Sequence, residues 1–288
     1  MPNADPVRAI ILHADDVGLC TATVKAFAEL SEMGAISSGS LMVPCPAFAE
    51  AAEHCRRHPR VDAGVHLTLT CEWESVRWGP VARLGPESGL LAEDGAFHRS
   101  RTAVGEGADS SAATVEMRAQ VEAAVAAGVD VTHVDCHMFA SLHPRLLSGY
   151  LGLARERDLP ALLWRPGAAA SRQEIGEAAR PEVEAWEKEG LPMVDHVAFL
   201  PLGDLGDRWE QARAAFDALP PGLTHFILHP ACDDPELRSI ARDWPARVAD
   251  YELFRSGRPV EYLRRQGVRI IGYRALRDSM RATPRAIS

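Results

Sequence analysis

Short runs rich in apolar residues alternate eight times with longer segments of helical periodicity, and this alternation most constrains the fold. Several runs are almost continuously apolar, as is typical of parallel strands covered on both faces. Repeated strand–helix units favour parallel strands joined by crossover helices, most economically in a (β/α) barrel. A doubly wound open sheet stays as the alternative, because alternation does not report closure. The predicted strands are Ala9–His13, Ile36–Val43, Asp62–Leu69, Val131–Asp135, Ala161–Arg165, His196–Leu200, Thr224–Leu228 and Val268–Tyr273.

Helical patterns fill the segments between these runs. The clearest of them cover Thr21–Met33, Pro46–His58 and Ser111–Ala127. Residues 71–110 break the alternation, because they lack a sustained period and are rich in Trp, Pro and Gly; we predict a long loop insertion there. We expect residues 1–280 to form one barrel domain and residues 281–288 to be a flexible tail.

Composition excludes several classes of protein. The 31 basic and 40 acidic residues give a formal charge of −9, so neither a nucleic-acid surface nor an anionic-membrane surface is expected. No apolar run reaches the ~18 residues of a membrane span, and Met1–Pro6 has no signal-peptide pattern. Six cysteines occur without C-x-x-C spacing. We therefore predict a cytoplasmic protein with reduced thiols. Nothing in the composition argues against a homodimer.

Polar residues gather where the predicted strands end. The carboxyl ends of parallel barrel strands form the face on which active sites are built, and a random distribution of tolerated polar residues would not favour that face. The residues in question are Asp15 and Asp16 after the first run, His66 in the third, Asp135 and His137 at the fourth, Arg165 at the fifth and His229 at the seventh.

Three of these residues are candidate metal ligands: Asp16, His66 and His137. Two imidazoles and one carboxylate, with the remaining positions open to water, are typical of a catalytic site for a divalent ion such as Mg²⁺ or Zn²⁺. Either histidine alone is more often a hydrogen-bonded core residue, but their joint position favours a metal. Asp16 has the opposite strand parity to Asp15, yet it begins the turn and can point inward.

The neighbouring residues suggest a division of labour around one metal ion. Asp15 is a candidate general base for an attacking water, and His229 a candidate acid for a leaving amine. Asp135 and His133 share a face with His137 and are candidates to orient the ligand imidazoles. Arg165 is either a substrate contact or the partner of a carboxylate.

Other catalytic patterns find little support. The chain contains no G-x-S-x-G, P-loop or G-x-G-x-x-G motif. Cys136 adjoins His137, but adjacent strand residues face opposite sides, which argues against a Cys–His nucleophile pair.

Four segments together resemble one family, the YdjC-like (chitooligosaccharide-type) carbohydrate deacetylases. The resemblance implies an irregular or distorted barrel of the sugar-deacetylase type, one divalent metal on Asp16, His66 and His137, and hydrolysis of acetyl groups from small N-acetylated sugars. It also implies that Asp15 is the base and His229 the acid. The segments are His13–Gly18, Gly64–Thr70, Thr132–His137 and Leu228–Pro230.

The chain departs from the family pattern near the predicted pocket. Phe139 stands where the family usually has a further histidine, and the loop after the third strand is distinctive. That loop carries Trp73 and Trp78 just after His66. Indole rings pack well on sugar faces, so we predict Trp78 in the substrate pocket; the alternative is that both indoles pin the loop. Another metal-assisted amide or lactone hydrolase, or a non-catalytic sugar-binding barrel, stays open as an alternative function.

Overall fold

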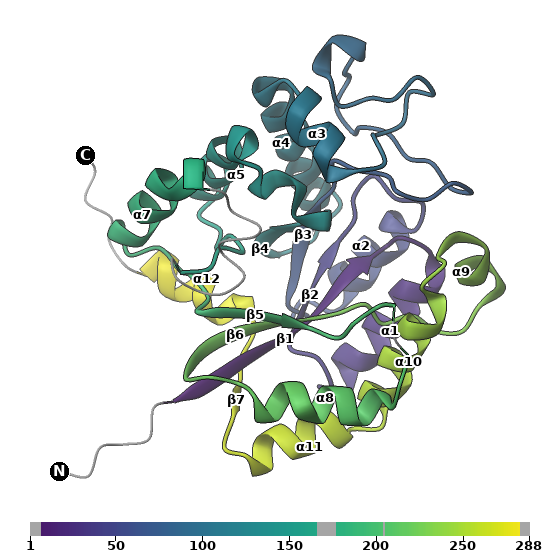
Figure 1. Ribbon diagram of the computed structural model, residues 1–288, viewed down its shortest axis with the longest axis vertical. Coiled ribbons are helices and arrows are strands. Elements are labelled where there is room, and N and C mark those ends of the chain that lie inside the picture. Colours follow the sequence, from purple (N-terminus) through teal and green to yellow (C-terminus); the bar gives the residue numbers. More distant parts are fainter. Residues whose placement is uncertain (1–6, 166–176, 204, 283–288) are drawn as a thin grey trace.

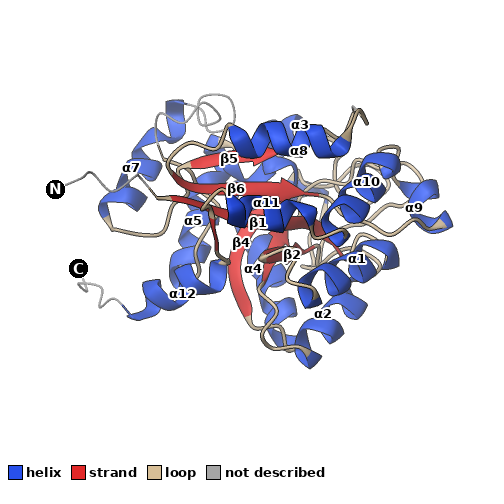
Figure 2. Cartoon of the chain, turned by 90° about the horizontal axis from the view of Figure 1, so that it is seen from below, coloured by secondary structure: helices blue, strands red, loops and turns tan. Residues whose placement is uncertain are grey.

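A parallel sheet of seven strands forms the centre of this computed structural model, which describes residues 7–165, 177–203 and 205–282. The hydrogen-bonded order is β4-β3-β2-β1-β6-β5, and β7 pairs with β1. Figure 2 shows the strands in the interior with helices around them. The strands are β1 (Arg8–Val17), β2 (Ser38–Leu41), β3 (Ala63–Leu67), β4 (Val131–Cys136), β5 (His196–Phe199), β6 (Gly222–Leu228) and β7 (Arg269–Ile270).

Helices follow the strands along the chain and surround the sheet (Figure 1). The patterns predicted from Thr21, Pro46 and Ser111 correspond to α1, α2 and α4. Among the described residues, no helix is long and apolar enough to cross a membrane. The α-helices are α1 (Thr21–Glu32), α2 (Phe48–Arg57), α3 (Arg101–Gly107), α4 (Ser110–Ala126), α5 (Pro144–Glu156), α7 (Arg180–Lys188), α8 (Arg208–Asp217), α9 (Pro235–Ile240), α10 (Trp244–Arg255), α11 (Arg258–Arg265) and α12 (Tyr273–Ala282), with 3₁₀ turns at Pro86–Ser88, His137–Leu142 and Glu177–Ala179.

The step from β4 to β5 is irregular, and here one predicted strand was wrong. Ala161–Arg165 forms isolated parallel bridges instead of a regular strand: Ala161 pairs with Val134, and Trp164 pairs with Val194. The preceding Pro160 accepts a hydrogen bond from the Val134 amide at 2.9 Å but has no N–H to donate. The parallel α/β arrangement that the alternation predicted is confirmed, with a barrel-like sheet that is distorted at this step.

The insertion at residues 71–110 is more structured than a loop. Ser100 caps α3 by accepting a hydrogen bond from the Ala103 amide. Buried Glu116 of α4 accepts from the amides of Val81 and Ala82 at 3.0 and 2.8 Å, which fastens the insertion to the helix layer. These contacts are made by backbone amides, so the hydrophobic pattern of the sequence could not predict them.

The end of the chain differs slightly from the prediction. Helix α12 continues through Ala282, two residues into the predicted tail. Residues 283–288, the rest of that tail, lie outside the described residues.

A close backbone approach couples β2 to α1 and β1. Gly39 of β2 lies so near Phe27 that a Cβ atom built on it would be 2.6 Å from the Phe27 ring and 2.9 Å from the Ala14 carbonyl oxygen. Phe27 is fully buried on α1. The absence of a side chain at Gly39 therefore lets α1 sit directly on the strands.

Gly39→Ala should destabilise the fold, because one added methyl group must displace a buried ring and a backbone oxygen. Overpacking of this kind costs about 1–3 kcal/mol in the free energy of unfolding. Gly152→Ala is the matched control: its Cβ would meet no atom within 4 Å, and a mid-helix Gly→Ala change is worth about 0.5–1 kcal/mol in the stabilising direction. Urea unfolding measures both, and a Gly39→Ala protein as stable as the original would contradict the packing argument.

Candidate metal centre and active site

Three predicted ligands converge at the carboxyl end of the sheet. Asp16 comes from the end of β1, His66 from β3 and His137 from the residue after β4. Asp16 Oδ1 lies 3.0 Å from His137 Nδ1 and 3.4 Å from His66 Nε2, and the two imidazole nitrogens are 3.4 Å apart. All three side chains are buried.

The chemistry of these atoms fits a divalent cation. Asp16 Oδ1 is buried and makes no hydrogen bond of acceptable geometry, although two imidazole nitrogens face it. A buried carboxylate oxygen without a hydrogen bond is costly, and a shared cation would satisfy it together with both nitrogens. Two nitrogen ligands and one oxygen ligand, with a cavity alongside, match an open catalytic metal site.

The backbone is strained at Asp16 and directly after His137. Asp16 has φ +61°, and the pairing of β1 with β2 shifts register between Ala14 and Val17. This bulge turns Asp16 to the same side as Asp15, which resolves the parity conflict noted in the sequence. Met138 and Phe139, directly after His137, also have positive φ values of 52° and 54°. Non-glycine residues in this region cost of order 1–3 kcal/mol each and cluster at functional sites.

Hydrogen-bond partners orient both imidazoles. His66 Nδ1 lies 3.1 Å from the Ser40 hydroxyl oxygen and forms an ion pair with Asp135 Oδ1 at 3.0 Å, which leaves Nε2 facing Asp16. The Ser40 hydroxyl donates to Asp135 Oδ2 at 2.9 Å. Glu72 holds His137 Nε2 at 3.0 Å. Burial lowers the pKa of each histidine, but the nearby carboxylates outweigh it: Asp135 and Asp15 raise the pKa of His66 well above its usual value, and Glu72 and Asp16 raise that of His137 to about 9.

A buried arginine fixes the other oxygen of Asp16. Arg247 of α10 donates to Asp16 Oδ2 at 2.8 Å and binds Asp243 through Nε and Nη2 at 2.9 and 3.1 Å. Burial alone would raise the pKa of Asp16, yet His137 and Arg247 hold it well below its usual range. Neither Arg247 nor Glu72 was among the sequence candidates, because Arg247 follows no predicted strand and Glu72 lies in the aperiodic insertion at residues 71–110.

A cavity of about 370 Å³ opens beside the three ligands. Asp15 borders it, with Oδ2 3.9 Å from His66 Nε2. His229 borders it as well: its backbone N–H donates to Asp250 at 3.1 Å, and within the described part of the chain its buried Nδ1 has no hydrogen-bond partner. The apolar part of the cavity lining includes Met138, Phe139, Phe199, Leu202 and Ile227.

Two predicted substrate contacts lie elsewhere. Trp78 is 4% exposed and donates its indole N–H to the Thr70 carbonyl at 2.9 Å, and it is not among the residues that line the cavity. Arg165 pairs with Glu187 and Asp195 and is also outside the cavity lining. The cavity is lined instead by Trp73, against which the Arg247 guanidinium packs at 5.9 Å from the ring centre.

The last two predicted residues lie in the interior. Asp135 contacts His66, as expected for a residue that orients a ligand. His133 instead contacts His13, at 2.8 Å between the Nε2 atoms, and its ring stacks on Tyr273 at 3.9 Å between centres. The structure therefore directs His133 toward Asp15 through His13, away from the metal ligands.

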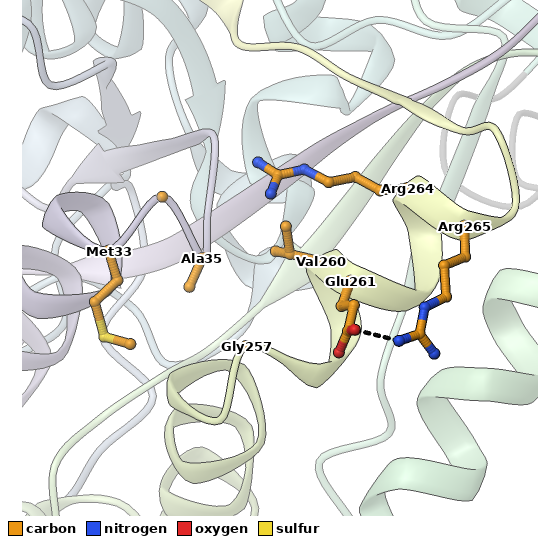
Figure 3. A pocket seen from close by; sticks show the side chains of 8 residues that line it. Met33, Ala35, Gly257, Val260, Glu261, Arg264 and Arg265 are labelled. Atoms are coloured by element: carbon orange, nitrogen blue, oxygen red, sulfur yellow. Dashed lines mark hydrogen bonds and ion pairs between the residues drawn. The ribbon is translucent and has the colours of Figure 1, made fainter.

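A second cavity, of about 450 Å³, lacks comparable chemistry (Figure 3). It lies between the end of α1 and helix α11. Its charged residues are Glu261, Arg264 and Arg265, and Glu261 is paired with Arg265. Among its lining residues there is no histidine, cysteine or aspartate, so it offers no set of converging ligands.

The fold and the cluster define a barrel-like α/β protein with a buried His/Asp group, able to hold a metal ion, at the carboxyl ends of its strands. The chain belongs to the YdjC-like protein family, whose sequence profile matches residues 9–265. The family resemblance inferred from the four segments is thereby confirmed.

Relatives match over most of the chain. It is 33% identical to a carbohydrate deacetylase of Thermus thermophilus over 253 residues, 85% of each chain. It is 24% identical to a carbohydrate deacetylase of Thermoanaerobacter pseudethanolicus over 271 residues, 94% of this chain and 100% of the other. A crystal structure from Enterococcus faecalis, of a protein named for cellobiose-phosphate cleavage, has the same fold, with a TM-score of 0.78, 24% identity and coverage of 94% and 99%.

Replacing both His66 and His137 by Ala should abolish stoichiometric binding of divalent metal, because one carboxylate alone holds such an ion weakly. Metal analysis after dialysis measures the loss, and circular dichroism checks the fold. His58→Ala, an exposed histidine at the end of α2, should keep the metal. Stoichiometric metal in the folded double variant would contradict the assignment.

Proposed function

We propose that this chain is a metal-dependent hydrolase that removes the acetyl group from an N-acetylated carbohydrate. The observation that carries the proposal is the convergence of Asp16, His66 and His137 beside Asp15 on one cavity. It is supported by relatives named carbohydrate deacetylase, one of them 33% identical over 85% of the chain.

One divalent ion, Mg²⁺ or Zn²⁺, is the proposed cofactor. Asp16 Oδ1, His66 Nε2 and His137 Nδ1 are the proposed ligand atoms, because they face one another. When bound, the ion would polarise the acetyl carbonyl and make the attacking water more acidic. The role of Arg247 is to hold Asp16 Oδ2, so that only Oδ1 is free for the ion.

Two side chains carry the proposed proton transfers. Asp15 accepts a proton from the attacking water as oxygen adds to the acetyl carbon. The C–N bond then breaks, and His229 donates a proton to the departing nitrogen, which releases acetate and a free amine on the sugar. Both residues border the cavity, and the hydrogen bond from the His229 backbone N–H to Asp250 holds the backbone from which the imidazole extends.

The cavity suits a small sugar. A volume of about 370 Å³ is at the lower end of the range for small-molecule sites. Trp73 offers an indole in the same cavity lining as the ligands, and Met138, Phe139 and Phe199 add apolar surface to that lining. Trp73 thus takes the role that the sequence suggested for Trp78.

Residues 1–280 are proposed to act as one catalytic domain. A cytoplasmic location is proposed as well, supported by six cysteines that are all unpaired. A homodimer stays a prediction, measurable by light scattering.

An acetate-release screen over N-acetylated mono- and disaccharides tests the activity. Acetate formed in step with free amine is the expected result with metal-loaded protein. Turnover of lactones or cyclic amides without acetate would instead favour another hydrolase on the same cavity. Saturable sugar binding without any turnover would favour a binding protein.

Asp15→Asn should lower kcat by ~10²–10⁴-fold, the usual contribution of a general base, while the bound metal and KM stay unchanged. The amide keeps the shape of the carboxylate but cannot accept the proton. Asp278→Asn, at an exposed position on α12, is the control and should keep full activity. Near-normal turnover of the Asp15→Asn protein would remove Asp15 from the mechanism.

Trp73→Ala should raise KM about 10-fold, with metal content and kcat little changed, because loss of a stacking ring removes about 1 kcal/mol or more of sugar binding. Trp78→Phe is the matched control, since it removes a buried indole and its hydrogen bond to Thr70 at a position that does not line the cavity. Steady-state kinetics on the best substrate compares the two. A larger KM effect for Trp78→Phe would reverse this assignment.

A further inference from the structure

A cluster of aromatic and imidazole rings fills the interior of the sheet directly beneath Asp15. It consists of His13 on β1, His133 on β4, His225 on β6 and Tyr273 at the start of α12, and all four are 0–1% exposed. His13 is central: its ring centre is 4.9 Å from that of His133 and 4.6 Å from that of His225. Its Nδ1 lies 2.6 Å from Asp15 Oδ1.

The far end of the cluster fixes one proton. Asp62 accepts hydrogen bonds from the Ser38 hydroxyl at 2.9 Å, the Thr132 hydroxyl at 2.6 Å and the Arg274 amide at 2.7 Å. A hydroxyl group has a single hydrogen to donate. The Thr132 hydrogen is therefore committed to Asp62, and Thr132 can only accept from other neighbours.

The next link sets the tautomer of His133. Its Nδ1 lies 3.0 Å from Thr132 Oγ1, so Nδ1 must carry the hydrogen of that bond. Burial holds the pKa of His133 well below its usual value. His133 thus has one proton, on Nδ1, and its Nε2 is a bare acceptor.

The last link determines His13. The two Nε2 atoms of His13 and His133 are 2.8 Å apart, and since the His133 atom is bare, His13 Nε2 must donate. On the other side of the ring, Nδ1 meets the Asp15 carboxylate. We propose that His13 is a buried imidazolium, protonated on both nitrogens, which acts as a positioning residue by binding Asp15 Oδ1 and leaving Oδ2 as the oxygen that reacts.

The groups that face His13 are consistent with a positive charge. Asp135 Oδ2 on β4 lies 3.9 Å from His13 Nε2, so carboxylates flank the ring on both sides. Burial keeps the pKa of His225 well below its usual value, so this neighbour adds no competing positive charge. Tyr273 contacts His225 Nδ1 through its hydroxyl at 3.0 Å. A buried carboxylate needs such a compensating cation.

The role of Asp15 Oδ2 rests on the proposed function, whereas the number of protons on His13 does not. With Oδ1 bound to His13, Asp15 Oδ2 is the oxygen directed toward His66, 3.9 Å away. Water would give its proton to Oδ2, and the proton of the His13–Asp15 bond would stay in place throughout.

Some of these residues also offer a candidate for a second metal site. His13, Asp15, Asp135 and His225 have potential ligand atoms within 4.8 Å of one another. A cation there would have to displace the protons that join His13 to Asp15 and His133. The hydrogen-bond chain from Asp62 therefore favours protons over metal. Two metal ions per chain would overturn the proposal.

Nitrogen NMR of the full, metal-free chain with ¹⁵N-labelled histidine tests the proton count without any substrate. We expect both ring nitrogens of His13 to resonate as protonated imidazolium nitrogens, and His133 to show one protonated and one bare nitrogen. His13→Asn identifies the signals. A bare nitrogen on His13 would place the shared proton on Asp15 and overturn the proposal.

Two substitutions at the Asp62 end of the cluster test the series of hydrogen bonds. Thr132→Val removes the acceptor of His133 Nδ1, so the His133 proton should move to Nε2 and His13 should become a neutral imidazole. Ser38→Ala deletes another donor to the same Asp62 carboxylate and should leave the His13 signals unchanged. Equal signals in the two variants would contradict the assignment.

Kinetics tests positioning. His13→Leu should lower kcat by roughly 10–100-fold, as for other partners of catalytic groups, with KM and metal content unchanged. His13→Asn, whose amide can replace the Nδ1 donor, should recover most of that loss. A folded Asn variant as slow as the Leu variant would refute the positioning role. If no acetylated sugar is turned over at all, the proposed function fails while the NMR result still decides the charge of His13.

Discussion

Burial of three carboxylates at one end of the sheet is the constraint on which the site depends. Asp15, Asp16 and Asp135 are 8%, 2% and 0% exposed, and an unpaired buried charge costs several kcal/mol. Each carboxylate therefore has a nitrogen partner. The partners are His13 for Asp15, Arg247 for Asp16 and His66 for Asp135. Because two of these three pairs join residues from different elements, the site exists only once the sheet and α10 have come together.

The bulge at the end of β1 gives two adjacent carboxylates different surroundings. In a regular strand Asp15 and Asp16 would face opposite sides, whereas the register shift and the φ of +61° at Asp16 bring both to the cavity. Asp16 is then shared between imidazoles and Arg247, and Asp15 between His13 and the cavity. Like charges this close resist joint ionisation unless cations separate them. The strained backbone at Asp16 thus places both carboxylates on the cavity and gives each of them different partners.

Position in the chain explains which features could be predicted. Asp16, His66 and His137 each adjoin a strand, and parallel strands end at one face, so their convergence follows from the alternation. Arg247 is 231 residues from Asp16 on a helix whose pattern does not distinguish it, and Glu72 and Trp73 lie in an irregular insertion. Hydrophobic periodicity indicates which side chains of a helix or strand face the core, but it gives no such information for an irregular segment. This is why the sequence favoured Trp78 over Trp73 for the cavity, and why Arg165, which pairs with Glu187 at the surface, looked like a site residue.

The buried histidine rings near the site explain why residue 64 of β3 is a glycine. Barrel interiors are usually filled by branched apolar residues, but here His13 and His133 occupy that space. A Cβ atom on Gly64 would lie 2.4 Å from the His133 ring, so only glycine leaves room for the imidazole beside β3. Gly64 and the proposed ligand His66 share a strand face, and His66 therefore follows two residues after the glycine that leaves room for His133. A larger residue at Gly64 would shift His133 and disturb Asp15 through His13 without touching any proposed metal ligand.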